Sequence, residues 1–89
     1  MVLSGKVFKG QKMIFYKSFE DTCDENATFR DRLENCLIGL CKEADIPVPI
    51  WLSKNTVELA NFHKTSFIAD QFVENVKFTR FEIEFVEKL

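Results

Sequence analysis

The clearest structural signal in the sequence is an amphipathic helix with a marked start and a marked end. Thr28 is a good N-cap residue, and Asp31 three residues later favours the positive end of the helix dipole. Ile46 precedes Pro47, which disfavours helical geometry and ends the helix near Asp45. We therefore expect Leu33, Leu37 and Leu40 to be buried, because the apolar side chains form one stripe about 100° wide: Phe29, Leu33, Cys36, Leu37, Leu40 and Ala44.

A β-hairpin is expected before this helix. Two runs rich in apolar residues, Val2–Phe8 and Lys12–Phe19, flank Lys9-Gly10-Gln11, and Gly10 can adopt the positive φ of a tight turn. A two-residue loop would join Leu3 and Val7 to Ile14 and Tyr16. A three-residue loop is preferred because it gives the more uniformly apolar face, with Leu3, Val7, Met13, Phe15 and Phe19. The opposite face then carries Lys6, Phe8, Lys12, Ile14 and Tyr16.

The second half of the chain predicts a stiff connector, a short helix and a last strand. Two prolines stiffen Ile46–Leu52, and Asn55-Thr56-Val57-Glu58 resembles a capping box that opens a helix to about His63. Residues 64–75 give no clear pattern. Val76–Phe85 alternates well from Phe81 onward, so we expect a strand with a bulge near Thr79.

Together these segments predict one α+β domain over residues 1–89, in the order β-β-α-α-β. The N-terminal hairpin and the C-terminal strand would form a three-stranded antiparallel sheet, packed against one long helix and one short helix.

The chain carries more apolar side chain than this fold can cover. Ten of the 89 residues are Phe, and each aromatic side chain buries roughly 150–250 Å². The long helix covers one face of the sheet, which leaves Phe8, Ile14 and Tyr16 pointing the other way. We expect this surface to form a homodimer or a larger symmetric assembly. The alternative is a monomer in which residues 46–72 fold back and cover this face completely. Trp51, in the proline-stiffened connector, is either a fourth interface residue or a lid that closes the core against the first helix.

Charge and cysteine content bear on partners and compartment. The net charge is −2, from 12 basic and 14 acidic side chains, so no overall attraction to nucleic acid or to an anionic membrane is expected. No apolar run approaches the length of a membrane span. The first residues do not follow the pattern of a secretory signal, and three cysteines cannot all pair. We therefore expect a reducing compartment, the cytoplasm.

No residue pattern predicts catalysis, a metal site or a cofactor. His63 is the only histidine, and no acidic or thiol side chain stands near it at the spacing of a metal motif. Cys36 and Cys41 would project about 140° apart on a helix, which is poor geometry for shared ligation. Cys23 lies in an acidic loop that disfavours its thiolate.

Three functional hypotheses follow. A protein-interaction or self-association domain without catalytic activity accounts best for the surplus apolar surface. The alternative is a single-stranded nucleic-acid-binding protein, in which Lys6, Phe8, Lys12 and Tyr16 stack bases and neutralise phosphates. The least favoured alternative is a small enzyme with His63 as its base.

Four segments of the sequence look like those of a known group. They are Val7-Phe8-Lys9-Gly10, the connector from Asp45 to Leu52, Lys54-Asn55-Thr56 and Asp70-Gln71-Phe72. Together they resemble a group of short, uncharacterised proteins from Firmicutes, along most of the chain. The resemblance implies an intracellular bacterial origin and attaches no chemistry to these motifs.

Overall fold

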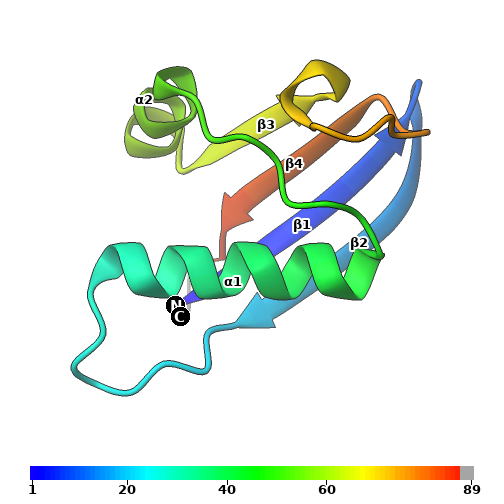
Figure 1. Cartoon of the computed structure of the whole chain (residues 1–89). Helices are drawn as coiled ribbons and strands as arrows, with labels where there is room; N and C mark the ends of the chain where they lie inside the picture. Colours follow the sequence, from blue (N-terminus) through cyan, green and yellow to red (C-terminus); the bar gives the residue numbers. More distant parts are fainter. Residues whose placement is uncertain (87–89) are drawn as a thin grey trace.

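The computed structural model describes residues 1–86 as a four-stranded antiparallel sheet with two helices on one face (Figure 1). The strand order is β2-β1-β4-β3, so the hairpin strands occupy one half of the sheet. No helix in this part of the chain is both long and apolar enough to cross a membrane. The elements are β1 (Val2–Lys9), β2 (Lys12–Glu20), α1 (Phe29–Ala44), α2 (Ser53–Phe62), β3 (Lys64–Ile68), the 3₁₀ turn η1 (Ala69–Gln71) and β4 (Arg80–Phe85).

The prediction of a three-stranded sheet is wrong, because the segment without a clear pattern supplies a fourth strand. β3 pairs with β4 in antiparallel register, with Phe67 opposite Phe81 and Thr65 opposite Ile83. These four side chains are all buried. A strand of five residues has too few alternations to stand out in the sequence, and its stability comes from this pairing. β4 is also shorter than expected, because it begins at Arg80 rather than at Val76.

The hairpin has a two-residue turn and a bulge instead of the expected three-residue loop. Lys9 pairs with Lys12 across Gly10, whose φ is 62°. The register then shifts by one residue, because Phe8 pairs with Met13 and Val7 pairs with Phe15, which leaves Ile14 as the extra residue.

Beyond the bulge, the side chains lie on the same faces of the sheet that a three-residue loop would have given them. Val7 lies opposite Phe15 and Leu3 opposite Phe19, so these four side chains share the face that the helices cover, as expected. Met13 was assigned to this face, but it lies before the bulge and shares the opposite face with Phe8. It is 47% exposed.

The long helix has the predicted N-cap and ends where expected. The Asp31 backbone N–H donates to Thr28 Oγ1 at 3.1 Å, and the Thr28 N–H donates to the Asp31 carboxylate at 3.2 Å. At the other end, Asp45 adopts a left-handed conformation, and the Ile46 N–H donates to the Cys41 carbonyl at 2.9 Å. These local hydrogen bonds explain why α1 could be predicted closely.

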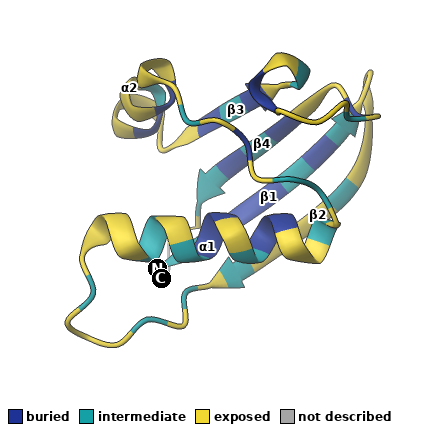
Figure 2. Cartoon of the chain, viewed as in Figure 1, coloured by how far each residue is buried: buried dark blue, intermediate teal, exposed yellow. Residues whose placement is uncertain are grey.

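The apolar stripe of α1 is buried along only part of its length. Leu37 and Leu40 are buried as expected, whereas Leu33 is only half-buried. Phe29, at the start of the stripe, is 60% exposed, and its ring meets the edge of Phe85 at the end of β4. The helical layer is therefore incomplete at this end (Figure 2).

The core lies between the sheet and the helices. Phe67 and Phe81 stack at 5.9 Å, and the loop before β4 closes the core with Phe72 against Phe78 at 5.0 Å. The core cluster of buried residues comprises Leu3, Val7, Cys36, Leu37, Leu40, Cys41, Phe67, Phe72, Phe78, Phe81 and Ile83.

A glycine allows α1 to lie close to the sheet. A Cβ added at Gly39, inside the helix, would overlap the Phe19 ring of β2. Glycine normally weakens a helix interior by about 1 kcal/mol relative to alanine. The close approach of helix and strand therefore depends on a residue that helix propensity alone disfavours.

We predict that Gly39→Ala destabilises the protein by about 1–2 kcal/mol, because overpacking against Phe19 outweighs the gain in helix propensity. Chemical denaturation measures the change. In the Phe19→Ala background the ring is gone, and the same substitution should then stabilise by about 1 kcal/mol. A stabilising effect of Gly39→Ala in the unaltered chain would contradict this packing.

Candidate functional site

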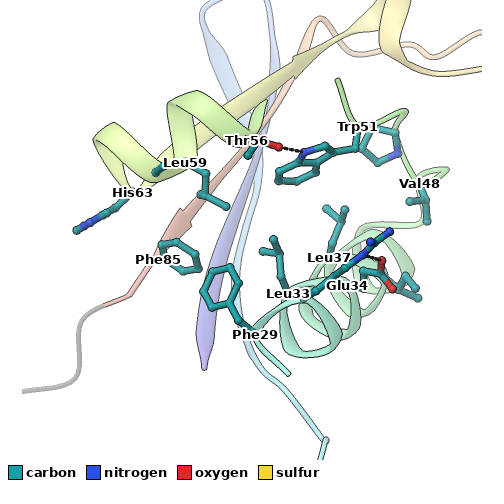
Figure 3. A pocket seen from close by; sticks show the side chains of 14 residues that line it. Phe29, Leu33, Glu34, Leu37, Val48, Trp51, Thr56, Leu59, His63 and Phe85 are labelled. Atoms are coloured by element: carbon teal, nitrogen blue, oxygen red, sulfur yellow. Dashed lines mark hydrogen bonds and ion pairs between the residues drawn. The ribbon is translucent and has the colours of Figure 1, made fainter. Parts of the chain in front are cut away.

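A groove lies between the two helices. α1 packs over β1 and β2, whereas α2 packs over β3, so the helices are separated above the sheet. The space between them has a volume of about 940 Å³ (Figure 3). Its α1 wall consists of Phe29, Arg30, Leu33, Glu34, Leu37 and Ile38, the connector contributes Val48, Pro49 and Trp51, its α2 wall consists of Thr56, Leu59, Ala60 and His63, and Phe85 lies between the walls.

Aromatic rings make up much of the groove. Phe85 meets Phe29 edge-on at 5.7 Å and His63 at 6.2 Å. Trp51 rests on the buried Phe67 ring at 5.7 Å, so it closes the core and lines the groove at once. A pocket with mostly apolar and aromatic walls and few polar groups is typical of a binding site.

Trp51 is held in place by a hydrogen bond. Its indole Nε1–H donates to Thr56 Oγ1 at 2.8 Å, across the start of α2 (Figure 3). This bond satisfies the polar atom of the indole and leaves the ring as an apolar wall.

The α2 wall depends on a buried amide. Asn55 is fully buried, and its Nδ2 donates to Thr65 Oγ1 at 2.8 Å and to the Ser66 carbonyl at 3.0 Å. Its Oδ1 accepts from the Leu52 N–H and from Gln71 Nε2, both at 3.0 Å. All four hydrogen-bonding positions of the amide are occupied.

Gln71 extends this network to the connector. Its Nε2 also donates to the Ile50 carbonyl at 3.2 Å, and its own backbone carbonyl accepts from the Ile50 N–H at 2.6 Å. The connector, Lys54-Asn55-Thr56 and Asp70-Gln71-Phe72 therefore meet in one hydrogen-bond network. The sequence predicted that Asn55-Thr56-Val57-Glu58 opens the short helix, but α2 already begins at Ser53, and Asn55 lies inside its first turn. The network itself was not predicted, because a buried amide carries no periodic signal.

His63 lies at the end of the groove rather than in a polar site. It ends α2 in a left-handed conformation, with φ of 59° and its N–H donating to the Leu59 carbonyl. Arg30 and Glu34, the other ionisable groups of the groove, pair with each other at 3.1 Å. Within residues 1–86, no group of three His, Cys, Asp or Glu side chains is placed to hold a metal ion.

The four predicted interface residues do not come together. Phe8 and Tyr16 lie on the sheet face opposite the helices, here called the open face, and Ile14 lies beside them at the bulge. Trp51 lies on the other side of the sheet, at the groove. On the open face the Arg80 guanidinium lies 4.2 Å from the Phe8 ring centre, so a charged group covers this apolar ring.

The open face mixes both signs of charge. Lys6 lies opposite Tyr16 on one side and Glu82 on the other, with its Nζ 5.6 Å from the Tyr16 ring centre. Lys12 pairs with Lys9 before the bulge and so points to the other face. The four residues predicted to bind nucleic acid are thus divided between the two faces of the sheet. Beside Lys6 lies the Glu82 carboxylate, which would repel phosphate.

All three cysteines are free thiols, and two are deeply buried. Burial raises the pKa of the Cys36 thiol to about 11 and that of the Cys41 thiol to about 12. Cys23 is partly exposed.

Comparisons with protein-family models, with curated proteins and with solved structures give no match. The resemblance to a group from Firmicutes therefore stays an expectation.

We predict that Asn55→Ala destabilises the protein by about 2–4 kcal/mol, because it leaves the Leu52 N–H and the buried Gln71 amide without their partner. Chemical denaturation followed by Trp51 fluorescence reports both stability and the position of the connector. Asn61→Ala, at an exposed position of the same helix, is the control and should change stability by less than about 0.5 kcal/mol. Equal effects of the two substitutions would contradict the proposed role of the network.

We predict that iodoacetamide at pH 8 modifies Cys23 in the folded protein and leaves Cys36 and Cys41 unmodified until the chain unfolds. The raised pKa values keep both buried thiols protonated at this pH, and burial blocks the reagent. Mass spectrometry before and after denaturation counts the modified thiols. Rapid modification of Cys36 or Cys41 in the native state, or an intramolecular disulfide, would be inconsistent with this packing.

Proposed function

We propose that this chain is a protein-interaction domain without catalytic activity, and that it binds the apolar face of a helical segment in the groove between α1 and α2. The observation that carries the proposal is the groove itself, about 940 Å³ in volume and lined mainly by apolar and aromatic side chains. Amphipathic helices commonly bind in such grooves through side chains one turn apart.

Exposed apolar side chains at the rim of the groove, where its lining meets solvent, support this proposal. Ile38 on α1 is 53% exposed and Val48 on the connector is 48% exposed, and both line the groove. Leaving such side chains in water has a cost in free energy, which burial by a partner would remove. The polar groups of the groove are few, and two of them pair with each other.

We further propose a cytoplasmic location. Two buried thiols support it, because Cys36 and Cys41 are free and lie within the core cluster. Free buried cysteines are ordinary in a reducing compartment and uncommon in small secreted domains, where cysteines usually form disulfides.

We predict that a photo-crosslinking amino acid placed at Ala60 forms a discrete protein adduct in the cells from which the chain comes, because Ala60 lines the groove and is exposed. The same amino acid at Asn61 is the matched control, since it is exposed on the same helix outside the groove. Mass spectrometry identifies the crosslinked peptide, which should be an amphipathic helical segment. The absence of any protein adduct from Ala60, or equal adducts from both positions, would reject the proposal.

A further inference from the structure

The groove side of α1 has a charge pattern that complements itself. Arg30 and Glu34 lie one helical turn apart, are 87% and 57% exposed at their side chains, and both line the groove. A two-fold axis that places two α1 helices antiparallel reverses this order. Each Arg30 can then face Glu34 of the other copy, so one surface is its own complement.

We infer that the segment bound in the groove is α1 of a second copy of this chain, in a two-fold symmetric dimer; this inference rests on the proposed function. Each α1 lies along the groove of the other copy. The two Arg30–Glu34 pairs cross the axis and set the antiparallel register.

Apolar side chains around the charge pair supply the buried surface. Phe29 precedes the pair on α1 and is 60% exposed, and Ile38 follows it and is 53% exposed. A monomer rarely exposes a contiguous apolar patch larger than a few hundred Å². In the dimer these side chains lie against the aromatic walls of the other copy, which exclude water from both grooves.

The charge balance of the rim favours a second copy over a strongly acidic or basic partner. Arg30 and Glu34 already neutralise each other, so the rim offers no net charge to such a partner. A second helix with the same Arg–Glu order, bound antiparallel to α1, keeps every one of these charges paired. α1 is such a helix.

The sheet offers weaker surfaces for self-association. The bulge at Ile14 interrupts the edge strand β2, and bulges of this kind hinder pairing between edge strands. On the open face, Arg80 covers Phe8. The groove combines an uncovered apolar surface with a charge pattern that specifies its partner.

Charge reversal tests the dimer directly. Multi-angle light scattering at micromolar concentrations should give twice the chain mass of 10.4 kDa for the unaltered protein. Arg30→Glu makes the rim acidic and Glu34→Arg makes it basic, so each variant alone should weaken the dimer at least tenfold. An equimolar mixture of the two should restore a heterodimer, and the double variant R30E/E34R should restore a homodimer. Lys17→Glu is the control, because Lys17 pairs with Glu43 outside the groove, and its reversal should leave the dimer intact.

Two results would overturn the inference. One is a mass of 10.4 kDa at all concentrations, and the other is a dimer that neither reversal weakens. If neither charge reversal weakens the dimer but Tyr16→Glu dissociates it, the interface lies on the open face. A monomer that still forms an adduct with a different protein through Ala60 refutes the second copy and leaves the proposed function standing, whereas a monomer without any adduct rejects both.

Discussion

The shape of the groove depends on the side-chain amide of Asn55. It is fully buried, and its four hydrogen bonds reach the connector, η1 and β3, elements that have no regular hydrogen-bond ladder with one another. In the low dielectric of the interior each of these bonds is strong, and an unpaired partner is costly. The amide therefore fixes the start of α2 relative to the edge of the sheet. Trp51 and Leu59 take their places on the groove wall as a result.

Local signals in the sequence were sufficient for the bounds of α1 and for the faces of the hairpin beyond the bulge. The Thr28 capping box and Pro47 define the helix within a few residues of the chain, so no tertiary information was needed. The hairpin loop was predicted with the wrong length, yet Leu3, Val7, Phe15 and Phe19 share the expected face. A two-residue turn followed by a one-residue bulge places the strand side chains on the same faces as a three-residue loop does. Only the observed strand pairing distinguishes the two cases.

Non-local pairing explains what the sequence did not show. β3 is short, and it pairs with a strand that begins at Arg80, beyond an irregular loop. Its place at the edge of the sheet sets the place of α2, and therefore whether any groove exists. Trp51 was predicted to be either an interface residue or a lid, and the structure places it against the buried Phe67 ring and in the lining of the groove. Asn55 was assigned to the start of the short helix and Gln71 only to a motif without a role, so the hydrogen bonds that join them were not predicted.

The junction at His63 has a kinetic consequence. This single left-handed residue joins α2 directly to β3, and the Asn55 network fixes the other end of α2. Since both ends of the short helix are fastened to the sheet, the wall keeps its form before anything binds. A preorganised surface of this kind loses little conformational entropy on association. The encounter rate would then be limited by diffusion and orientation, with no slow ordering step, and differences in affinity would appear mainly in the lifetime of the complex.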